Sequence, residues 1–300
     1  ILNVFTAICL VFCEVAHGAS ASPNPVSVTG FEPLPELRSE ALTELSGLAV
    51  SRRDSRLVWA VNDSGNAASL VALNAQAEVV GVVPVQDGYN HDWEDLASFE
   101  LDGRPWLLIA DTGDNFSLRA EVALILVPEP QRTDRSVLPE RVIRFRYEDG
   151  PRDCEAVAVD ATRRRVLLAD KGRDPAGLYE LPLDGEAGVR IARRIGELPE
   201  LVPTSPPRVP TLGGVRGRGT PTAMSLSADG RRLAVLTYLS LTLFERGADE
   251  DWPAALRRPP LRSERLPRRP LFEALALSPD GRSALAGTEG ERAFLYRWTP

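Results

Sequence analysis

Acidic side chains recur in this chain as pairs separated by a single residue. Asp92 and Glu94 form one pair, and Asp153 and Glu155 form another. Each pair opens a short apolar run, and residues i and i+2 of a β-strand point to the same face. The two carboxylates of a pair are therefore expected to point together. Converging carboxylates repel one another, and a proton or a bound cation relieves that repulsion.

Similar positions elsewhere in the chain extend this set. If the apolar runs converge in space, the candidate metal ligands are Glu44, Asp92, Glu94, Asp153, Glu155 and Glu273. Ca²⁺ takes 6–8 oxygen ligands, whereas Zn²⁺ prefers His and Cys. The pattern therefore predicts calcium, or another divalent cation, as the cofactor. The alternative is that these acids only begin strands in solvent.

A second polar set follows the next apolar run of each copy. Its candidate members are Asn62, Asp63, Asp111, Asp114, Asn115 and Asp170. Asp and Asn accept hydrogen bonds from nearby backbone N–H groups in turns. We expect these residues to cap turns, or to hold the metal ligands in position.

Catalytic candidates are few. His91 is the one histidine after residue 21, and it cannot by itself provide a Ser-His or Cys-His arrangement. Asp92 or Asp153 could act as a general base beside a metal-bound water. Lys171 is expected to form a surface ion pair, for example with Asp170, or to contact an anionic ligand.

These residues lie on a repeated strand, hairpin, strand unit. Aligned on its first strand, the unit recurs at Ser46, Glu94, Glu155, Thr222 and Glu273, and the second strand ends at Asp63, Asp111, Asp170, Thr237 and Thr288. Repeats of about 50 residues indicate one supersecondary unit copied around a ring or along a stack. We predict an all-β fold, a β-propeller of four-stranded blades with five visible repeats and a sixth possible.

Three further features of the sequence limit how this fold can be organised. Residues 26–31 are predicted to close the ring as a strand beside the C-terminal repeat. The Pro-, Gly- and Arg-rich segments near 199–221 and 251–270 are expected to be insertions or loops. Thr220 and Thr222 replace the acids in the fourth copy, so the ring of carboxylates is expected to be incomplete.

The bulk composition excludes some functions. The chain has 300 residues, 43% of them hydrophobic, and a net charge of −7. Residues 22–300 are expected to form one folded domain. The acidic balance argues against a nucleic-acid partner. Cys154 is predicted to be a buried core thiol and not a nucleophile.

The N-terminus is predicted to direct export. Residues 1–13 form an apolar run, and Ala19-Ser20-Ala21 fits a cleavage site, so residues 1–21 are expected to be a signal peptide. A truncated start or an uncleaved anchor stays open. The mature chain is expected to be periplasmic or extracellular in a bacterium, monomeric, and without a membrane span.

The motifs Glu44-Leu-Ser-Gly-Leu-Ala, Asn62-Asp63-Ser-Gly, Asp92-Trp-Glu-Asp95, Asp111-x-Gly-Asp-Asn115 and Asp153-Cys-Glu-Ala156 carry a family resemblance. They resemble exported bacterial β-propeller proteins near the phytase-like ("esterase-like activity of phytase") and SdiA-regulated families, and more remotely the calcium-dependent lactonases. The resemblance implies metal near the channel mouth, at Glu44, Glu94, Glu155 and Glu273. It leaves function open, because this fold hosts many activities.

Three functions are compatible with these observations. The first is cation binding at an acidic channel mouth, with a small anionic or polyol ligand. The second is a metal-dependent hydrolase of phosphate esters or lactones. The third is a non-catalytic interaction platform in the cell envelope.

Overall fold

The computed structural model describes residues 30–171, 175–201, 219–269 and 271–299. Within these residues the regular structure is almost entirely β-strand, and the helix α1 (Trp252–Ala255) is a single turn. The strands form three four-stranded sheets and one eight-stranded sheet. The all-β class expected from the repeats is confirmed.

The first two antiparallel units follow one another along the chain. The first contains β2 (Leu45–Val50), β3 (Val58–Asn62), β4 (Ser69–Leu73) and β5 (Val79–Pro84). The second contains β6 (Trp93–Leu101), β7 (Arg104–Asp111), β8 (Val122–Pro128) and β9 (Arg141–Tyr147). In each unit consecutive strands are hydrogen-bonded neighbours.

The remaining units repeat this order. The third contains β10 (Cys154–Asp160), β11 (Arg165–Asp170), β12 (Gly177–Pro182) and β13 (Arg190–Glu197). The fourth contains β14 (Pro221–Leu226), β15 (Arg232–Thr237), β16 (Ser240–Glu245) and β17 (Arg262–Arg265). The fifth contains β18 (Phe272–Leu277), β19 (Ala284–Thr288) and β20 (Leu295–Trp298), completed by β1 (Phe31–Pro33). The eight-stranded sheet consists of the second and third units, joined by the parallel pair β9 and β13.

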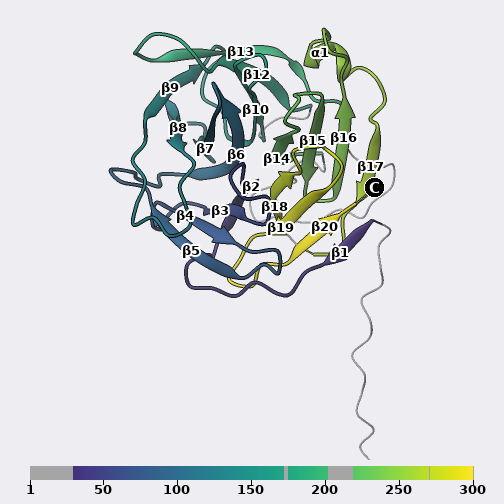
Figure 1. The fold of residues 1–300 in the computed structure, drawn as a ribbon. Coiled ribbons are helices and arrows are strands. Elements are labelled where there is room, and N and C mark those ends of the chain that lie inside the picture. Colours follow the sequence, from purple (N-terminus) through teal and green to yellow (C-terminus); the bar gives the residue numbers. More distant parts are fainter. Residues whose placement is uncertain (1–29, 172–174, 202–218, 270, 300) are drawn as a thin grey trace, which may run out of the picture.

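The units are arranged around a common centre. Figure 1 shows their first strands, β2, β6, β10, β14 and β18, innermost. Each first strand contacts the first strand of the next unit, and β18 contacts β2. Within the described ranges we find these five units and no sixth. The arrangement brings the equivalent ends of five strands together at the middle of the molecule.

Burial explains why the inner strands carry continuous apolar sequence. All seven residues of β10 are buried, because this strand has sheet neighbours on both faces. On β9 buried and exposed side chains alternate, as expected for a strand with one solvated face. The core lies between adjacent sheets: Leu167 of β11, for example, belongs to one apolar cluster with Met224 of β14.

The turns between paired strands follow from local sequence. Asp102 and Gly103 connect β6 and β7, and both have positive φ angles, 53° and 73°. A two-residue hairpin with both angles positive matches the right-handed twist of the flanking strands, and Asp-Gly is a favoured sequence for it. The hairpin fixes the register of the strand that carries Glu94.

The observed boundaries of several segments differ from those expected from sequence or lie outside the described ranges. The strand that completes the fifth unit is Phe31–Pro33, which overlaps the expected segment only at Phe31, and residues 26–29 lie outside the described ranges. The expected insertion at 251–270 contains α1 and β17, and β17 is the outer strand of the fourth unit. Most of 199–221 lies outside the described ranges, as does the predicted signal at 1–21.

Two further expectations concern Cys154 and membrane-spanning segments. Cys154 is fully buried, as expected, and burial raises the pKa of its thiol to about 12. This thiol therefore stays protonated at neutral pH and is a poor nucleophile. Among the described residues, the structure contains no helix with the length and apolar character needed to cross a bilayer.

Candidate metal centre

A β-bulge occurs at the same position in the first strand of every unit. The extra residue that interrupts the pairing with the second strand is Ser46, Glu94, Glu155, Thr222 or Glu273. A bulge re-aims a side chain and increases the local twist, and bulges are over-represented next to functional sites. The column aligned by sequence is thus a column of bulged residues at the inner ends of the units.

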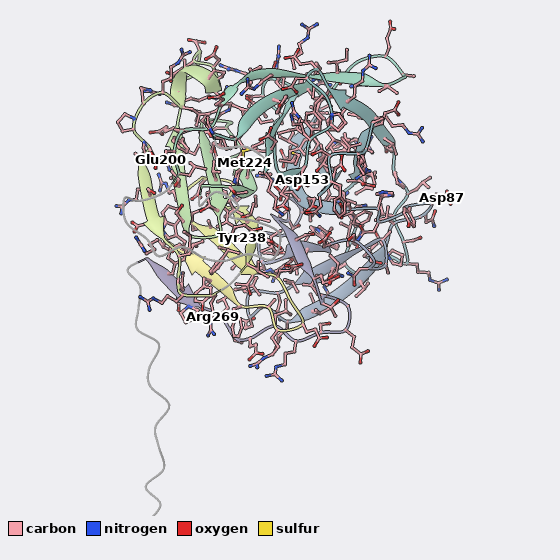
Figure 2. All side chains as sticks on the ribbon, turned by 180° about the vertical axis from the view of Figure 1, so that it is seen from behind. Asp87, Asp153, Glu200, Met224, Tyr238 and Arg269 are labelled. Carbon is pink, nitrogen blue, oxygen red and sulfur yellow. The ribbon has the colours of Figure 1, made fainter. Side chains whose placement is uncertain are left out.

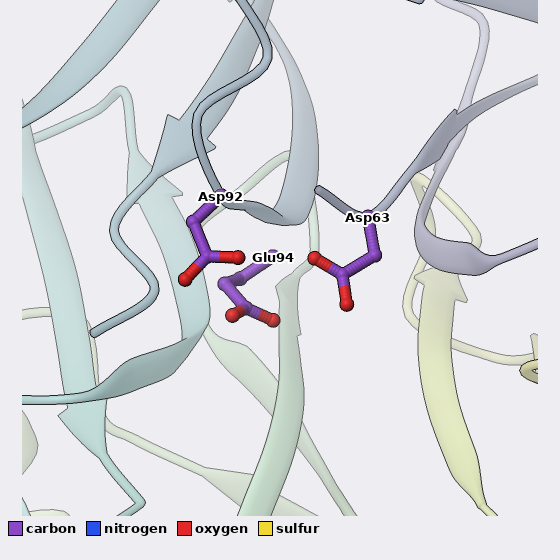
Figure 3. A group of neighbouring side chains, drawn as sticks. All are labelled: Asp63, Asp92 and Glu94. Carbon is purple, nitrogen blue, oxygen red and sulfur yellow. The ribbon is translucent and has the colours of Figure 1, made fainter. Parts of the chain in front are cut away.

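Three carboxylates converge at the first of two overlapping sites. Asp63 follows β3, Asp92 precedes β6, and Glu94 is the bulged residue of β6. One oxygen from each lies within 4.8 Å of the others, and Figure 3 shows the three carboxyl groups directed toward one another. Glu94 is buried, whereas Asp63 and Asp92 are partly exposed. We call this group the first triad.

A second triad shares Glu94 with the first. It contains Glu94, Asp153 and Glu155, all buried, with ligand oxygens again within 4.8 Å of one another. Lys171, at the end of β11, forms an ion pair with Oε1 of Glu155. Oε2 of Glu155 is buried and has no hydrogen-bond partner among the described residues. We call the five carboxylates of the two triads the acidic cluster.

Burial and mutual repulsion make the cluster hard to ionise. Burial, with the charge of Asp63 next in size, raises the pKa of Glu94 well above its usual value, although Lys171 opposes the shift. Burial also raises the pKa of Asp92, and it raises that of Asp63 to about 6. Carboxylates in this state take up protons at higher pH than free carboxylates do, and a bound cation would compete with those protons.

Backbone groups complete the wall of the cluster. A Cβ atom placed on Gly113 would overlap the carboxylates of Glu94 and Asp92, so only glycine leaves these side chains their space. The N–H of Asp114 donates to Oδ1 of Asp153 at 3.0 Å. The Asp111-Thr112-Gly113-Asp114 segment therefore acts on the cluster mainly through its backbone.

A carboxyl pair from the fifth unit, Glu273 and Glu289, lies outside both triads but within electrostatic range of Lys171. Glu273, the bulged residue of β18, accepts a hydrogen bond from the Tyr238 hydroxyl at 3.1 Å. Burial, together with the charge of Glu289, raises the pKa of Glu273 to about 8, and burial also raises that of Glu289. Figure 2 shows Asp153 and Tyr238 toward the middle of the molecule, with Asp87 and Arg269 at its periphery. Glu273, proposed from sequence as a metal ligand, belongs to neither triad.

The strand register corrects the sequence alignment of the first unit. Trp93 pairs with Asp111 and Cys154 pairs with Asp170, but Leu45 pairs with Asn62. The residue equivalent to Asp111 is therefore Asn62. Asp63 lies one position further on, equivalent to Lys171, Tyr238 and Glu289. Sequence alignment assigned Asp63 to the turn-capping set, whereas the structure places it in the first triad.

In the second polar set, Asn62, Asp114 and Asp170 accept hydrogen bonds from backbone N–H groups. Asn62 Oδ1 accepts from the N–H groups of Thr43 and Glu44, each at 3.0 Å. Asp111 forms an ion pair with Arg119 at 2.8 Å. Asp114 accepts from the N–H groups of Leu118 and Arg119, Asp170 accepts from that of Gly177, and Asn115 is exposed.

Three predicted site residues lie in other environments than expected. Glu44 is exposed, accepts from the side chain of Asn66, and lies outside both triads. His91 is exposed, with its ring edge-on to Tyr89 at 5.8 Å. Lys171, expected in a surface ion pair, is only 9% exposed and pairs with Glu155 instead of Asp170.

Asp95 was not among the sequence candidates, yet it is central to the assembly. It is fully buried, and its carboxylate accepts from the N–H groups of Leu96 at 2.8 Å, Val157 at 2.8 Å and Met224 at 3.2 Å. These groups belong to β6, β10 and β14, so one side chain connects three units. The available signal in the sequence was a third acid directly after the pair Asp92 and Glu94. Local sequence does not identify the backbone N–H groups that this acid accepts from.

The fourth unit presents neutral groups, as the sequence predicts. Thr220 and Thr222 are buried, and the Thr222 hydroxyl donates to the carbonyl of Phe272 at 2.7 Å. The acidic cluster is consequently one-sided, built by the first three units.

Comparison with known proteins adds no family assignment. The sequence matches no protein-family model, and no curated protein matches it significantly. Function must therefore be proposed from the site itself.

Proposed function

We propose that the chain is a five-bladed β-propeller that binds one divalent cation in the acidic cluster and uses it to hold a small anionic or polyol ligand. The cyclic contacts of the five first strands and the pairing of β1 with β20 support the propeller architecture. The chemistry of the cluster supports the cation.

The observation that carries this proposal is the first triad. Carboxylates of Asp63, Asp92 and Glu94 converge within 4.8 Å, and no basic side chain among the described residues forms an ion pair with any of them. All three have raised pKa values, so their negative charge is poorly compensated. Hard oxygen ligands suit Ca²⁺, and the second triad, which shares Glu94, offers further oxygens from Asp153.

Calorimetric titration of the metal-stripped protein with Ca²⁺ tests the proposal. We expect saturable binding and a rise in melting temperature that depends on Ca²⁺ concentration. Asp92→Asn should abolish both effects. Asp111→Asn is the matched control, because Asp111 belongs to neither triad and should leave binding intact. No binding by the wild-type protein at millimolar Ca²⁺ would refute the proposal.

A second candidate function, a metal-dependent hydrolase of phosphate esters or lactones, is favoured by one observation. Glu273 has a pKa of about 8, hydrogen-bonds with Tyr238 and lies beside Glu289, so this carboxyl pair retains a proton at neutral pH. A held proton near a cation could be donated to a leaving oxygen. A panel of phosphoesters and lactones, assayed with wild type and Glu273→Gln, tests this role. Turnover by neither protein would exclude it for those substrates.

We also propose export, on the basis of the apolar run at residues 1–13 and the Ala19-Ser20-Ala21 motif. Fractionation of a bacterial host followed by N-terminal sequencing tests it, and a mature chain that begins at residue 22 is expected.

We propose a monomer, which light scattering at micromolar concentration checks. The likeness to phytase-like and SdiA-regulated families remains part of the same proposal.

A further inference from the structure

Lys171 is an unusual residue in this chain. Every other basic side chain among the 35 Lys and Arg residues is arginine. The exception is Lys171 at the acidic cluster, which is 9% exposed and whose ammonium pairs with Oε1 of Glu155. Lysine and arginine differ in the shape and hydration of their charged groups, so they are not interchangeable at a packed, charged position.

The two triads define two adjacent positions for positive charge. Both use Glu94, and within each triad the ligand oxygens lie within 4.8 Å of one another. The second triad already has a cation, the Lys171 ammonium, on one oxygen of Glu155. The first triad has no ion-paired basic group among the described residues. The Lys171 ammonium therefore supplies the positive charge at one of the two positions.

One atom shows that the second position could accept more than the ammonium. Glu155 is 3% exposed, and its Oε2 has no hydrogen-bond partner among the described residues. A buried carboxylate oxygen normally has a partner, because leaving it unsatisfied is costly. Oε2 is thus a ligand atom available to an ion in the second triad.

We propose that Lys171 is a built-in cation that closes a second divalent-cation site formed by Glu94, Asp153 and Glu155. The inference rests on the proposed function, because the first triad is taken to bind the ion in the wild-type chain. A neutral side chain at position 171 would open the second triad, and the chain would then bind two ions that share Glu94. Paired metal sites bridged by carboxylates are common in phosphate-processing enzymes.

Lysine suits this role for a physical reason. Its ammonium is a compact point charge, close in character to a hydrated metal ion, whereas the arginine guanidinium is a planar fork that needs more space. Lys171→Arg is therefore expected to disturb the cluster even though the charge is kept.

Mn²⁺ titration of the full chain, by calorimetry and electron paramagnetic resonance, tests the proposal. Wild type should bind one ion, with an isolated-ion spectrum. Lys171→Met, which keeps an unbranched apolar stem one atom shorter and removes the charge, should bind one additional ion, with a spectrum showing spin coupling between the two. The double variant Lys171→Met/Glu155→Gln should return to one ion.

Folding is checked by circular dichroism and a cooperative thermal transition. A folded Lys171→Met variant that binds no more Mn²⁺ than wild type overturns the proposal. Glu155→Gln with Lys171 intact provides a second variant, which should retain the single ion, and loss of that ion would equally overturn the assignment. If wild type binds no ion while Lys171→Met binds one, the proposed function fails but the closing role of Lys171 is supported.

Discussion

Glu94→Gln gives a strong test of the physical reasoning, because Glu94 belongs to both triads. At about 4.8 Å and an effective dielectric constant near 20, one like-charge pair costs about 3.5 kcal/mol. Lys171 offsets part of that repulsion, and a retained proton limits the rest. We therefore expect Glu94→Gln to stabilise the metal-free protein by about 2–4 kcal/mol at pH ~8. For a domain of this size that is a rise in melting temperature of about 4–7 °C.

The sign of the pH dependence follows from the raised pKa of Glu94. A carboxyl whose folded-state pKa is raised contributes stability that is present at low pH and lost as pH rises. The difference between Glu94→Gln and wild type should thus be small near pH ~4 and grow toward pH ~8. Below the ordinary pKa both side chains are neutral, so they become nearly equivalent.

Differential scanning calorimetry in EDTA and in millimolar Ca²⁺ measures both effects. Wild type should be less stable than the variant in EDTA and should gain stability with Ca²⁺, whereas the variant should not respond to Ca²⁺. A variant that melts below wild type in EDTA at pH ~8, or that gains as much from Ca²⁺ as wild type does, would refute the reasoning.

Three other predictions follow from individual contacts. Asp95→Ala should lower the free energy of unfolding by about 3–5 kcal/mol, because three buried N–H groups lose their acceptor. Urea titration measures this change, and an effect below about 1 kcal/mol would contradict the prediction. Gly113→Ala should abolish Ca²⁺ binding in calorimetry, since its Cβ would overlap the Glu94 carboxylate, whereas Gly196→Ala, where the nearest atom is 3.8 Å away, should not. The stability of the metal-free protein should fall as pH rises from ~5 through ~8, because the folded-state pKa of Glu273 is about 8. Glu273→Gln should flatten that decline, and an unchanged slope would argue against the raised pKa of Glu273.

Local pattern was sufficient for most of the secondary structure. Apolar runs of strand length, separated by turn residues, predicted a repeated strand, hairpin, strand unit, and β2 with β3 and β6 with β7 each form such an antiparallel pair. The all-β class and the five copies follow from the same periodicity. The short outer strand β17 was missed, because its Arg-Ser-Glu-Arg sequence has no apolar face to mark it.

The sequence alignment of the first unit was wrong by one residue. Asp63 seemed equivalent to Asp111 because both precede a small residue and a glycine. Hydrogen-bond pairing instead matches Asn62 with Asp111, and a shift of one residue reverses the face on which a side chain lies. Asp63 consequently points into the first triad, beside Glu94.

The sequence by itself determined the repeated strands, the aligned column from Ser46 to Glu273 and the one-sided distribution of acids, because periodicity and residue type are local properties. Only the tertiary structure decided which carboxylates meet. Asp63 and Glu94 come from different units, and Lys171 reaches Glu155 because their neighbours Asp170 and Cys154 pair across two strands. Burial determines how these carboxylates ionise. In solvent the same groups would be ionised at neutral pH and would titrate independently of one another.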